Sequence, residues 1–167
     1  RSPRKESSAA SDVYKRQTLH RSGTSRTQQV DTTTTGLDLF GSDRAVVAMR
    51  VDGNLVDLQR ELHDGAEVEP VEATSEDGLN IIRHSATHVM AQAVQQLYPE
   101  VNLGIGPFIT DGFYYDFGNI EPVTPEVLSE LEKRMKRIVK ENQRFVRRVT
   151  TEESAREELA DQPYKLE

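Results

Sequence analysis

Apolar residues recur along the chain with two different spacings, which predict a small sheet followed by a mainly helical region. Residues 45–51 are almost continuously apolar, and residues 66–71 alternate between apolar and polar character, as strands buried on one face do. From Leu79 onward the apolar residues instead recur every three to four positions, which is the spacing of an amphipathic helix. We therefore expect an α+β fold in which the first sheet ends near Glu72 and a polar linker occupies residues 73–78.

The region after this linker is predicted to hold two long helices and a β-hairpin between them. The first helix is expected from Leu79 to Tyr98, because Pro99 cannot continue it. Thr124, followed by a proline and an acidic residue, predicts the start of the second helix, which extends to Asn142. The other predicted elements are hairpin strands at Val101–Pro107 and Phe113–Phe117, a strand at Arg144–Val149 and a last helix from Thr151 to Ala160. The residues expected to face inward are Leu79, Ile82, Ala86, Val89, Met90, Ala93 and Leu97 on the first helix and Leu128, Leu131, Met135, Ile138 and Val139 on the second.

Residues 1–27 show neither helical nor strand periodicity and contain few large aliphatic residues. They carry seven Lys and Arg residues against two Asp and Glu residues, and we interpret them as a disordered basic tail. Within this tail, Arg1–Gln17 resembles a translated sequencing-adapter remnant, so part of the tail is not expected to be native. A basic arm that binds RNA is the alternative interpretation of this segment.

The overall charge limits how the chain can contact nucleic acid. Its formal net charge is −7, and the residues after position 27 hold 14 Lys and Arg against 26 Asp and Glu. The overall field of such a fold does not attract nucleic acid, so an RNA contact requires a local basic patch. No apolar run approaches the ~20 residues that cross a bilayer, and the first residues lack the apolar core of a secretory signal. The chain has no cysteine, which excludes disulfides, and we expect a cytoplasmic protein without a membrane partner.

His84 and His88 are the sharpest candidates for chemistry. Their spacing of four residues on a helix places both imidazoles on one face, where they can converge on one ligand or one water molecule. The alternative is a pair of solvated surface histidines. As a zinc site the pair is incomplete, because zinc takes three or four protein ligands, so we expect no metal site in this sequence.

Two further groups of residues have both a structural and a functional interpretation. In the aromatic run after Gly112, alternation places Phe113 and Tyr115 on one face and Tyr114 and Asp116 on the other, and such aromatic residues are more often core than binding site. A basic cluster consists of Lys133, Arg134, Lys136, Arg137, Lys140, Arg144, Arg147 and Arg148. Phosphate contact is one role for this cluster, but we prefer a solvated helix face balanced by nearby acidic residues.

The order of these segments resembles bacterial threonyl-tRNA synthetases. The resemblance is carried by residues 77–88 (DGLNIIRHSATH), residues 103–107 (LGIGP) and residues 111–117 (DGFYYDF), and it continues to residues 163–167 (PYKLE). It covers the chain from about Thr32 to Glu167, and its character is actinobacterial. It implies an N-terminal piece of such an enzyme, with a ubiquitin-like β-grasp domain of the TGS type over residues 28–72, whose first strand is doubtful, and an editing domain over residues 79–167.

The resemblance also implies roles for individual residues. Editing in this family hydrolyses seryl-tRNA(Thr), and His84 and His88 match the first half of the editing motif, whose second half is a downstream Cys-x-x-x-His. Tyr115 and Lys165 match positions that line the editing pocket. His84 would orient or deprotonate the attacking water, Lys165 would stabilise charge on the ester oxygens, His88 would shape the pocket, and Tyr115 would hold the terminal adenosine or the amino acid.

The same resemblance implies what lies outside the chain. The class II core that binds ATP, magnesium and threonine, together with its zinc, would follow Glu167, so the segment alone is expected to be inactive in ligation and editing. The full-length enzyme would be a homodimer through that core and would bind tRNA(Thr). Two rivals remain open: a free-standing hydrolase of the alanyl-tRNA synthetase type, which would use zinc, and a non-catalytic binding module that carries a TGS domain.

Overall fold

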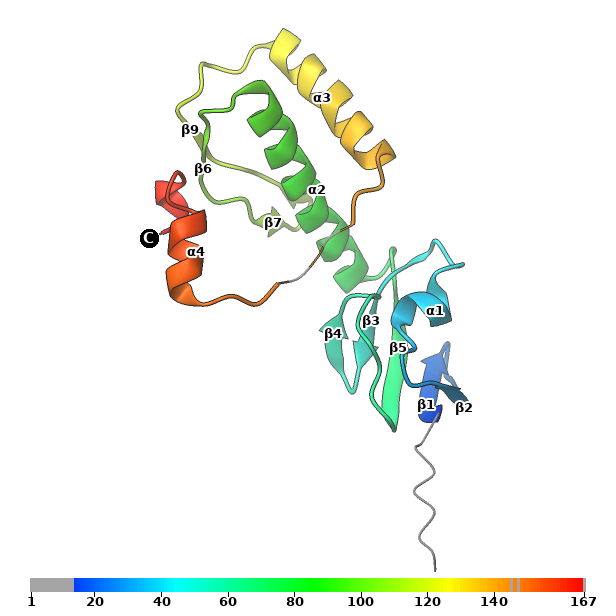
Figure 1. Cartoon of the computed structure of the whole chain (residues 1–167). Helices are drawn as coiled ribbons and strands as arrows, with labels where there is room; N and C mark the ends of the chain where they lie inside the picture. The colour runs from blue at the N-terminus through cyan, green and yellow to red at the C-terminus, as the bar shows by residue number, and fades with distance from the viewer. Residues whose placement is uncertain (1–13, 145, 147, 167) are drawn as a thin grey trace, which may run out of the picture. The chain divides into compact units, whose positions relative to one another are not determined.

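The computed structural model describes residues 14–144, 146 and 148–166 of the chain, which divides into two compact units with a boundary between Leu79 and Asn80. The first unit is a mixed five-stranded sheet with one short helix, and the second combines helices with a hairpin of very short strands. The chain is therefore a mixed α+β protein, as the two spacings of apolar residues predicted (Figure 1).

The sheet of the first unit has the strand order β2-β1-β5-β3-β4. The first and last strands along the chain, β1 and β5, pair in parallel, and all other neighbours in the sheet are antiparallel. The strands are β1 (Tyr14–Arg21), β2 (Thr24–Asp31), β3 (Val46–Val51), β4 (Asn54–Val56) and β5 (Ala66–Glu72), and the helix is α1 (Gly36–Phe40). The two strands predicted from their apolar patterns, over residues 45–51 and 66–71, are confirmed as β3 and β5.

The core of this unit lies between the sheet and α1. Its buried residues are Phe40, Val46, Met49, Leu62, Ala66 and Val68. Gly36 shows how closely α1 approaches the sheet, because a Cβ there would lie 2.5 Å from the sulfur of Met49. A tightly packed core of this kind is expected to hold the sheet in one arrangement.

The expectation of a disordered tail is wrong for residues 14–27, which form β1 and the first half of β2. This segment is ordered although it has few aliphatic residues, because β1 lies inside the sheet and has a hydrogen-bonded strand on each side. Gln17 of β1 is fully buried, and its side-chain amide donates to the carbonyl of His63 at 2.8 Å. A first strand therefore occupies the place that the sequence left doubtful. Residues 1–13 lie outside the described part, and the non-native origin of Arg1–Gln17 stays an interpretation.

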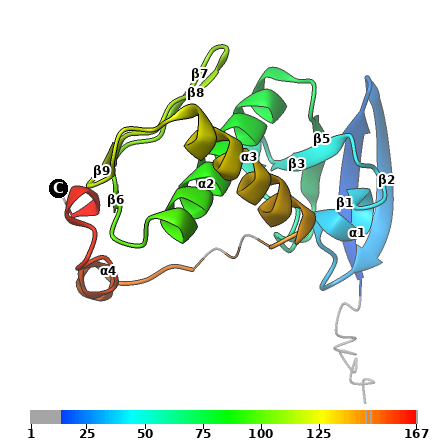
Figure 2. The same cartoon turned by 90° about the horizontal axis from the view of Figure 1, so that it is seen from above.

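The second unit is built on two long helices that lie side by side (Figures 1 and 2). Its elements are α2 (Glu76–Leu97, which begins in the first unit), β6 (Asn102–Leu103), β7 (Phe108–Ile109), β8 (Gly112–Phe113), β9 (Phe117–Gly118), α3 (Pro125–Lys140), α4 (Glu152–Glu158) and the 3-10 turn η1 (Pro163–Lys165). Strand β6 pairs with β9 and β7 pairs with β8, so the predicted hairpin is present with its turn between Ile109 and Gly112. The buried core contains Ala93, Val94, Val101, Leu131 and Ile138.

Helix α2 begins at Glu76, three residues before the predicted start. The hydroxyl of Ser75 accepts a hydrogen bond from the backbone N–H of Gly78 at 3.1 Å and so satisfies one of the first free donors of the helix. Gly78 itself must lack a side chain, because a Cβ there would lie under 3.0 Å from the carbonyl oxygen of Glu72. The predicted linker therefore shortens to residues 73–75.

Several predicted inward positions are wrong. Leu79 and Ile82 of α2 are substantially exposed, as are Leu128 and Val139 of α3, which are 58% and 66% exposed. The core-facing residues of α3 are instead Val127, Leu131, Met135 and Ile138, which recur at intervals of three and four. The described residues of the predicted strand at 144–149 form no strand, and Val146 and Val149 are exposed.

Candidate functional site

The two histidines of α2 converge as their spacing predicted. The Nε2 atoms of His84 and His88 lie 2.9 Å apart, and the ring centroids lie 4.7 Å apart with the planes inclined at 66°. At that distance one ring nitrogen donates a hydrogen bond to the other, so the two neutral rings must be in different tautomers. Both side chains are exposed, so the pair remains accessible to a substrate or to water.

Tyr115 lies in the hairpin, between β8 and β9. Its ring stacks on that of Phe117, with centroids 4.7 Å apart and planes inclined at 11°. The backbone around it is held by pairing across the hairpin: Gly104 N–H donates to the carbonyl of Asp116, and Asp116 N–H donates to the carbonyl of Ile105, both at 2.9 Å. The neighbouring Tyr114 is half exposed, which agrees with its predicted place on the other face of the segment.

Lys165 comes from η1, fifty residues after Tyr115 along the chain. Its ammonium group donates to the carbonyl of Gly104 at 2.7 Å and lies 5.7 Å from the centre of the Tyr115 ring. A cation over an aromatic face is attracted by the ring, so this contact helps to fix both side chains. Lys165 thus lies over Tyr115 and its charge acts on His88, and the four residues singled out from the sequence come from three separate segments of the second unit.

The charges around His88 favour its neutral form. Partial burial of the imidazole lowers the pKa of His88, and the positive charges of His84 and Lys165 lower it further. A neutral imidazole near pH 7 can accept a proton from water, which is what general-base catalysis requires. The arrangement is therefore chemically suited to activating a water molecule beside a cationic group.

Three contributors to this region were not found from the sequence. Phe108 of β7 lies edge-on to His84, with ring centroids 6.2 Å apart. Gln162 anchors the segment that carries Lys165, because its side chain accepts from Leu103 N–H at 2.8 Å and donates to the carbonyl of Val101 at 3.3 Å. Gly106 adjoins the Tyr115 ring. These contacts join residues between nine and about sixty positions apart, which local patterns do not encode.

A pocket of about 270 Å³ adjoins the histidine pair. It is lined by His88, Val89, Gln92, Ile138, Val139, Asn142, Gln143 and Arg144, and so lies between α2 and the end of α3. The amide of Gln92 donates to the side-chain oxygen of Gln143 at 3.1 Å across it. This pocket gives a ligand of His88 room next to the imidazole.

The other histidines have separate surroundings in the first unit. His63 Nε2 lies 2.9 Å from a carboxylate oxygen of Asp52, and His20 Nδ1 lies 2.8 Å from the hydroxyl of Ser25. Among residues 14–144, 146 and 148–166, no three His, Cys, Asp or Glu side chains are grouped so that they could hold a metal ion. The histidine pair therefore has no third ligand of this kind within the described structure.

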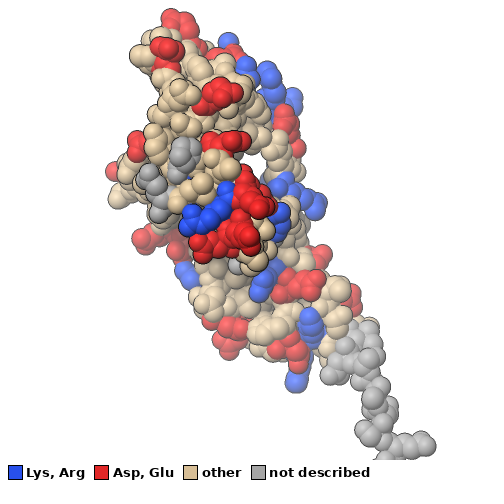
Figure 3. All heavy atoms as spheres, turned by 60° about the vertical axis from the view of Figure 1, so that its left-hand side comes forward, with Lys and Arg blue, Asp and Glu red and all other residues tan. Residues whose placement is uncertain are grey.

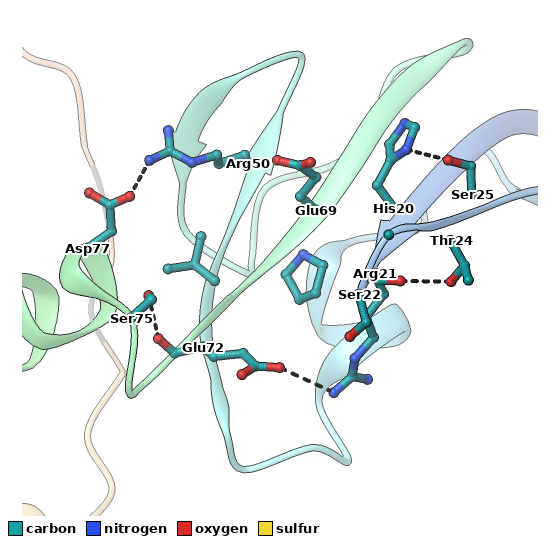
Figure 4. Close-up of a pocket in the computed structure, with 13 residues that line it drawn as sticks. His20, Arg21, Ser22, Thr24, Ser25, Arg50, Glu69, Glu72, Ser75 and Asp77 are labelled. Atoms are coloured by element: carbon teal, nitrogen blue, oxygen red, sulfur yellow. Dashed lines mark hydrogen bonds and ion pairs between the residues drawn. The ribbon is translucent and has the colours of Figure 1, made fainter.

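A larger pocket, of about 550 Å³, lies in the first unit and is shown in Figure 4. Both arginines of its lining are paired: Arg50 with Asp77, and Arg21 with the neighbouring Asp43, while Arg21 also lies 3.9 Å from Glu72. Because these pairs neutralise both arginines, the described lining of the pocket offers no unpaired Lys or Arg to an anionic ligand.

The predicted basic cluster is partly neutralised. Arg134 pairs with Glu130 at 2.9 Å, Lys136 pairs with Glu132 at 2.5 Å, and Arg148 pairs with Glu158. Figure 3 shows Lys and Arg side chains interspersed with Asp and Glu side chains on the face it draws. These ion pairs support the solvated helix face that we preferred, whereas Arg147 lies outside the described residues. Within the described part of the chain, no helix is long and apolar enough to cross a membrane.

Comparison with known proteins gives a consistent set of relatives, although no family model matches the chain. It is 64% identical over 138 residues to a threonine–tRNA ligase of Streptomyces avermitilis, a match covering 83% of this chain and 21% of the relative. It is 60% identical over 139 residues to that of Pseudarthrobacter chlorophenolicus and 54% identical over 140 residues to that of Bifidobacterium longum, each match covering 21% of the relative. The chain thus spans about a fifth of the length of these relatives.

Proposed function

We propose, for a chain that belongs by sequence to the threonine–tRNA ligase family, that the second unit contributes to a site that hydrolyses mischarged tRNA. The longer protein would attach threonine to tRNA(Thr) at the expense of ATP, and the site around His84 and His88 would remove serine attached in error. We place the ATP, magnesium and zinc sites, the class II core and the dimer contact in the part of the relatives that this chain does not match. The protein would act in the cytoplasm.

The physical need for such a site follows from the substrates. Serine lacks one methyl group of threonine, and a pocket discriminates against a missing methylene by only ~1–3 kcal/mol. A second, hydrolytic site is the available way to remove the smaller amino acid.

The observations that carry the proposal are the convergence of His84 and His88, the place of Lys165 over the Tyr115 ring, and the effect of the Lys165 charge on His88. With Nε2 atoms 2.9 Å apart, the histidines can share the proton taken from an attacking water, and His84 is the residue that we assign to that step. The ammonium group of Lys165 would stabilise the negative charge that develops on the ester oxygens. His88 would shape the pocket beside it, and Tyr115 would hold the terminal adenosine or the amino acid.

For the first unit we propose a TGS domain of the β-grasp type. The support is its sheet, in which the first and last strands, β1 and β5, pair in parallel at the centre. Strand β2 pairs with β1 on one side, and the β3–β4 hairpin lies beside β5 on the other. The presence of such a domain before α2, the helix that carries His84 and His88, favours the synthetase over a free-standing alanyl-type hydrolase, and so do the named relatives.

The test uses a chimera in which this chain replaces the matched region of the Streptomyces avermitilis protein. We expect Lys165→Ala to abolish hydrolysis of seryl-tRNA(Thr) while threonine activation is unchanged, and His84→Gln to slow hydrolysis by ~10²-fold or more, as loss of a general base does. Lys140→Ala and His63→Gln are matched controls that remove the same groups elsewhere in the chain. Undiminished hydrolysis in Lys165→Ala would overturn the assignment of that residue.

A further inference from the structure

Gly106 lies against the ring of Tyr115 in a way that leaves no room for a side chain. A Cβ at position 106 would lie under 3.0 Å from three atoms of that ring, Cγ, Cδ2 and Cε2. One of these atoms, Cγ, is bonded to the Cβ of Tyr115, so a rotation that moves only the far end of the ring does not relieve the clash. Any side chain at position 106 must displace the ring as a whole.

The backbone at Gly106 does not itself demand glycine. Within the described residues, the glycines with positive φ are Gly23, Gly53 and Gly65, so Gly106 has a conformation open to other residues. The requirement for glycine at position 106 therefore comes from the neighbouring ring.

The position of this ring is linked to that of Lys165. The ring stacks on Phe117, and the Lys165 ammonium lies over it at 5.7 Å while donating to the carbonyl of Gly104, two residues before Gly106. One short stretch of backbone thus contacts both the ring and the cation of the candidate site. A ring that moved away from Gly106 would change the surroundings of the ammonium group.

We propose that Gly106 is a positioning residue of the candidate site, where the absence of a side chain lets the Tyr115 ring lie against the main chain beside Lys165. This inference rests on the function proposed above, because it assigns Gly106 to the same site. Gly106 acts through Tyr115 and need not touch the substrate.

The decisive variant is Gly106→Ala, measured in the chimera described above. A displacement of about 1 Å in a substrate-positioning group lowers the rate by up to ~10²-fold, and we expect kcat/KM for seryl-tRNA(Thr) hydrolysis to fall by that order. The fall should appear mainly in KM, because Tyr115 is assigned to binding. A variant that is merely less stable would instead lower kcat in proportion to its unfolded fraction and leave KM unchanged.

Gly112→Ala is the matched control in the same hairpin. Gly112 also lacks a positive φ, and no heavy atom lies within 4 Å of a Cβ built there. This variant should hydrolyse the substrate like the parent chimera.

A double-mutant cycle separates positioning from general damage to the hairpin. Tyr115→Ala removes the three atoms that a Cβ at position 106 would meet. Gly106→Ala alone should also lower the melting temperature, because the ring must move. In the Tyr115→Ala background it should change neither kcat/KM nor the melting temperature, since the effects of contacting residues are not additive. An equal loss in both backgrounds would overturn the proposal, because Gly106 would then act independently of Tyr115.

A spectroscopic measurement on the chain itself keeps this inference distinct from the proposed function. Gly106→Ala should shift the ring resonances of Tyr115 and Phe117, whereas Gly112→Ala should leave them in place. If the parent chimera fails to hydrolyse seryl-tRNA(Thr), the proposed function fails while the ring shifts still support the placement of Tyr115 by Gly106. Unchanged ring resonances in Gly106→Ala would overturn the inference even if hydrolysis fell.

Discussion

In the first unit the strands β1 and β2 run for eight residues each, whereas each strand of the second unit has only two residues within the described part of the chain. Backbone hydrogen bonds along the long ladder hold the first unit together, and a core of buried apolar residues packs against the sheet. The hairpin of the second unit depends more on side chains: stacked rings, a lysine on a carbonyl and a glutamine that bonds two backbone groups.

This difference indicates where single substitutions will act. A change of one exposed side chain in the five-stranded sheet is buffered by many backbone hydrogen bonds, so only a change in the ladder or in the core is expected to disrupt the sheet. In the second unit, the positions of the residues in the candidate site depend on contacts made by single side chains. A region that holds exposed functional groups through side-chain contacts is expected to be the more sensitive in function and the less stable in folding.

The largest expected effect is on the ladder, and it tests whether β1 is an integral strand. The Arg21–Thr24 pair that closes the two-residue turn is hydrogen-bonded, and the pairs along β1 and β2 alternate from there, so Thr18 and Thr27 form a non-hydrogen-bonded pair. The N–H of Thr18 therefore points to β5, and the N–H of Thr27 points away from the sheet. Thr18→Pro should therefore lower the free energy of unfolding of the first unit by ~3 kcal/mol or more, whereas Thr27→Pro on the edge strand should cost much less.

Urea denaturation followed at backbone amides of β3 and β5 would measure both variants. Equal effects from Thr18→Pro and Thr27→Pro would mean that β1 does not lie inside the sheet.

A smaller effect is expected from the core of the second unit, and it tests which side of α3 packs. Leu131 is 8% exposed and Leu128 is 58% exposed, although the sequence pattern placed both inward. Leu131→Ala should lower the free energy of unfolding by an amount near the lower end of the ~2–5 kcal/mol range for buried leucine, and Leu128→Ala should change it by less than ~0.5 kcal/mol. Thermal and urea unfolding of the two variants would check this, and a loss in Leu128→Ala that matched Leu131→Ala would contradict the orientation of the helix.

The next largest effects on stability are expected from the N-caps of two helices, α3, which packs in the core, and α4, which does not. The hydroxyl of Thr124 accepts from Val127 N–H at 3.4 Å at the start of α3, and that of Thr151 accepts from Ser154 N–H at 3.3 Å at the start of α4. Thr124→Ala should cost ~1 kcal/mol of global stability. Thr151→Ala should instead unfold α4 locally, because α4 buries no residue, and hydrogen exchange would show protection lost there alone.

The comparison of the two units also explains what the sequence could predict. Apolar spacing predicted helices α2 and α3, and Thr124 serves as the N-cap of α3 as expected. The last helix was predicted to begin at Thr151, which is instead the N-cap of α4. The strands β1 and β2 were missed because their residues are polar, and their order comes from pairing with each other and with β5, which no local pattern records.

The candidate site divides in the same way. The convergence of His84 and His88 follows from helical geometry alone, so their spacing was sufficient to predict it. Tyr115 and Lys165 were named through a resemblance to a family, since nothing in their local sequence distinguishes them. The contacts that fix them, through Gly104, Gly106 and Gln162, join segments about sixty or about ten residues apart and became visible only in the structure.

The smallest expected effect concerns pH and is specific to the second unit. The pKa of His88 is lowered in the folded chain from its ordinary value of 6.5, first by burial and then by the charges of His84 and Lys165. Between the two pKa values the unfolded chain binds more protons than the folded chain, so protonation favours unfolding. The free energy of unfolding of the second unit should therefore be highest above pH 6.5 and decrease as the pH falls through the lowered pKa.

His88→Gln removes this titrating group, so its unfolding free energy should depend less on pH over the same window. His63→Gln, which removes a histidine from the first unit, should keep the full dependence of the second unit. Urea denaturation between about pH 5 and pH 8, followed at amides of α3, would measure the slopes. If the unfolding free energy of His88→Gln depended on pH as strongly as that of the parent, another group would take up the proton. If the unfolding free energy of the parent instead rose as the pH fell, the pKa of His88 would be raised rather than lowered on folding.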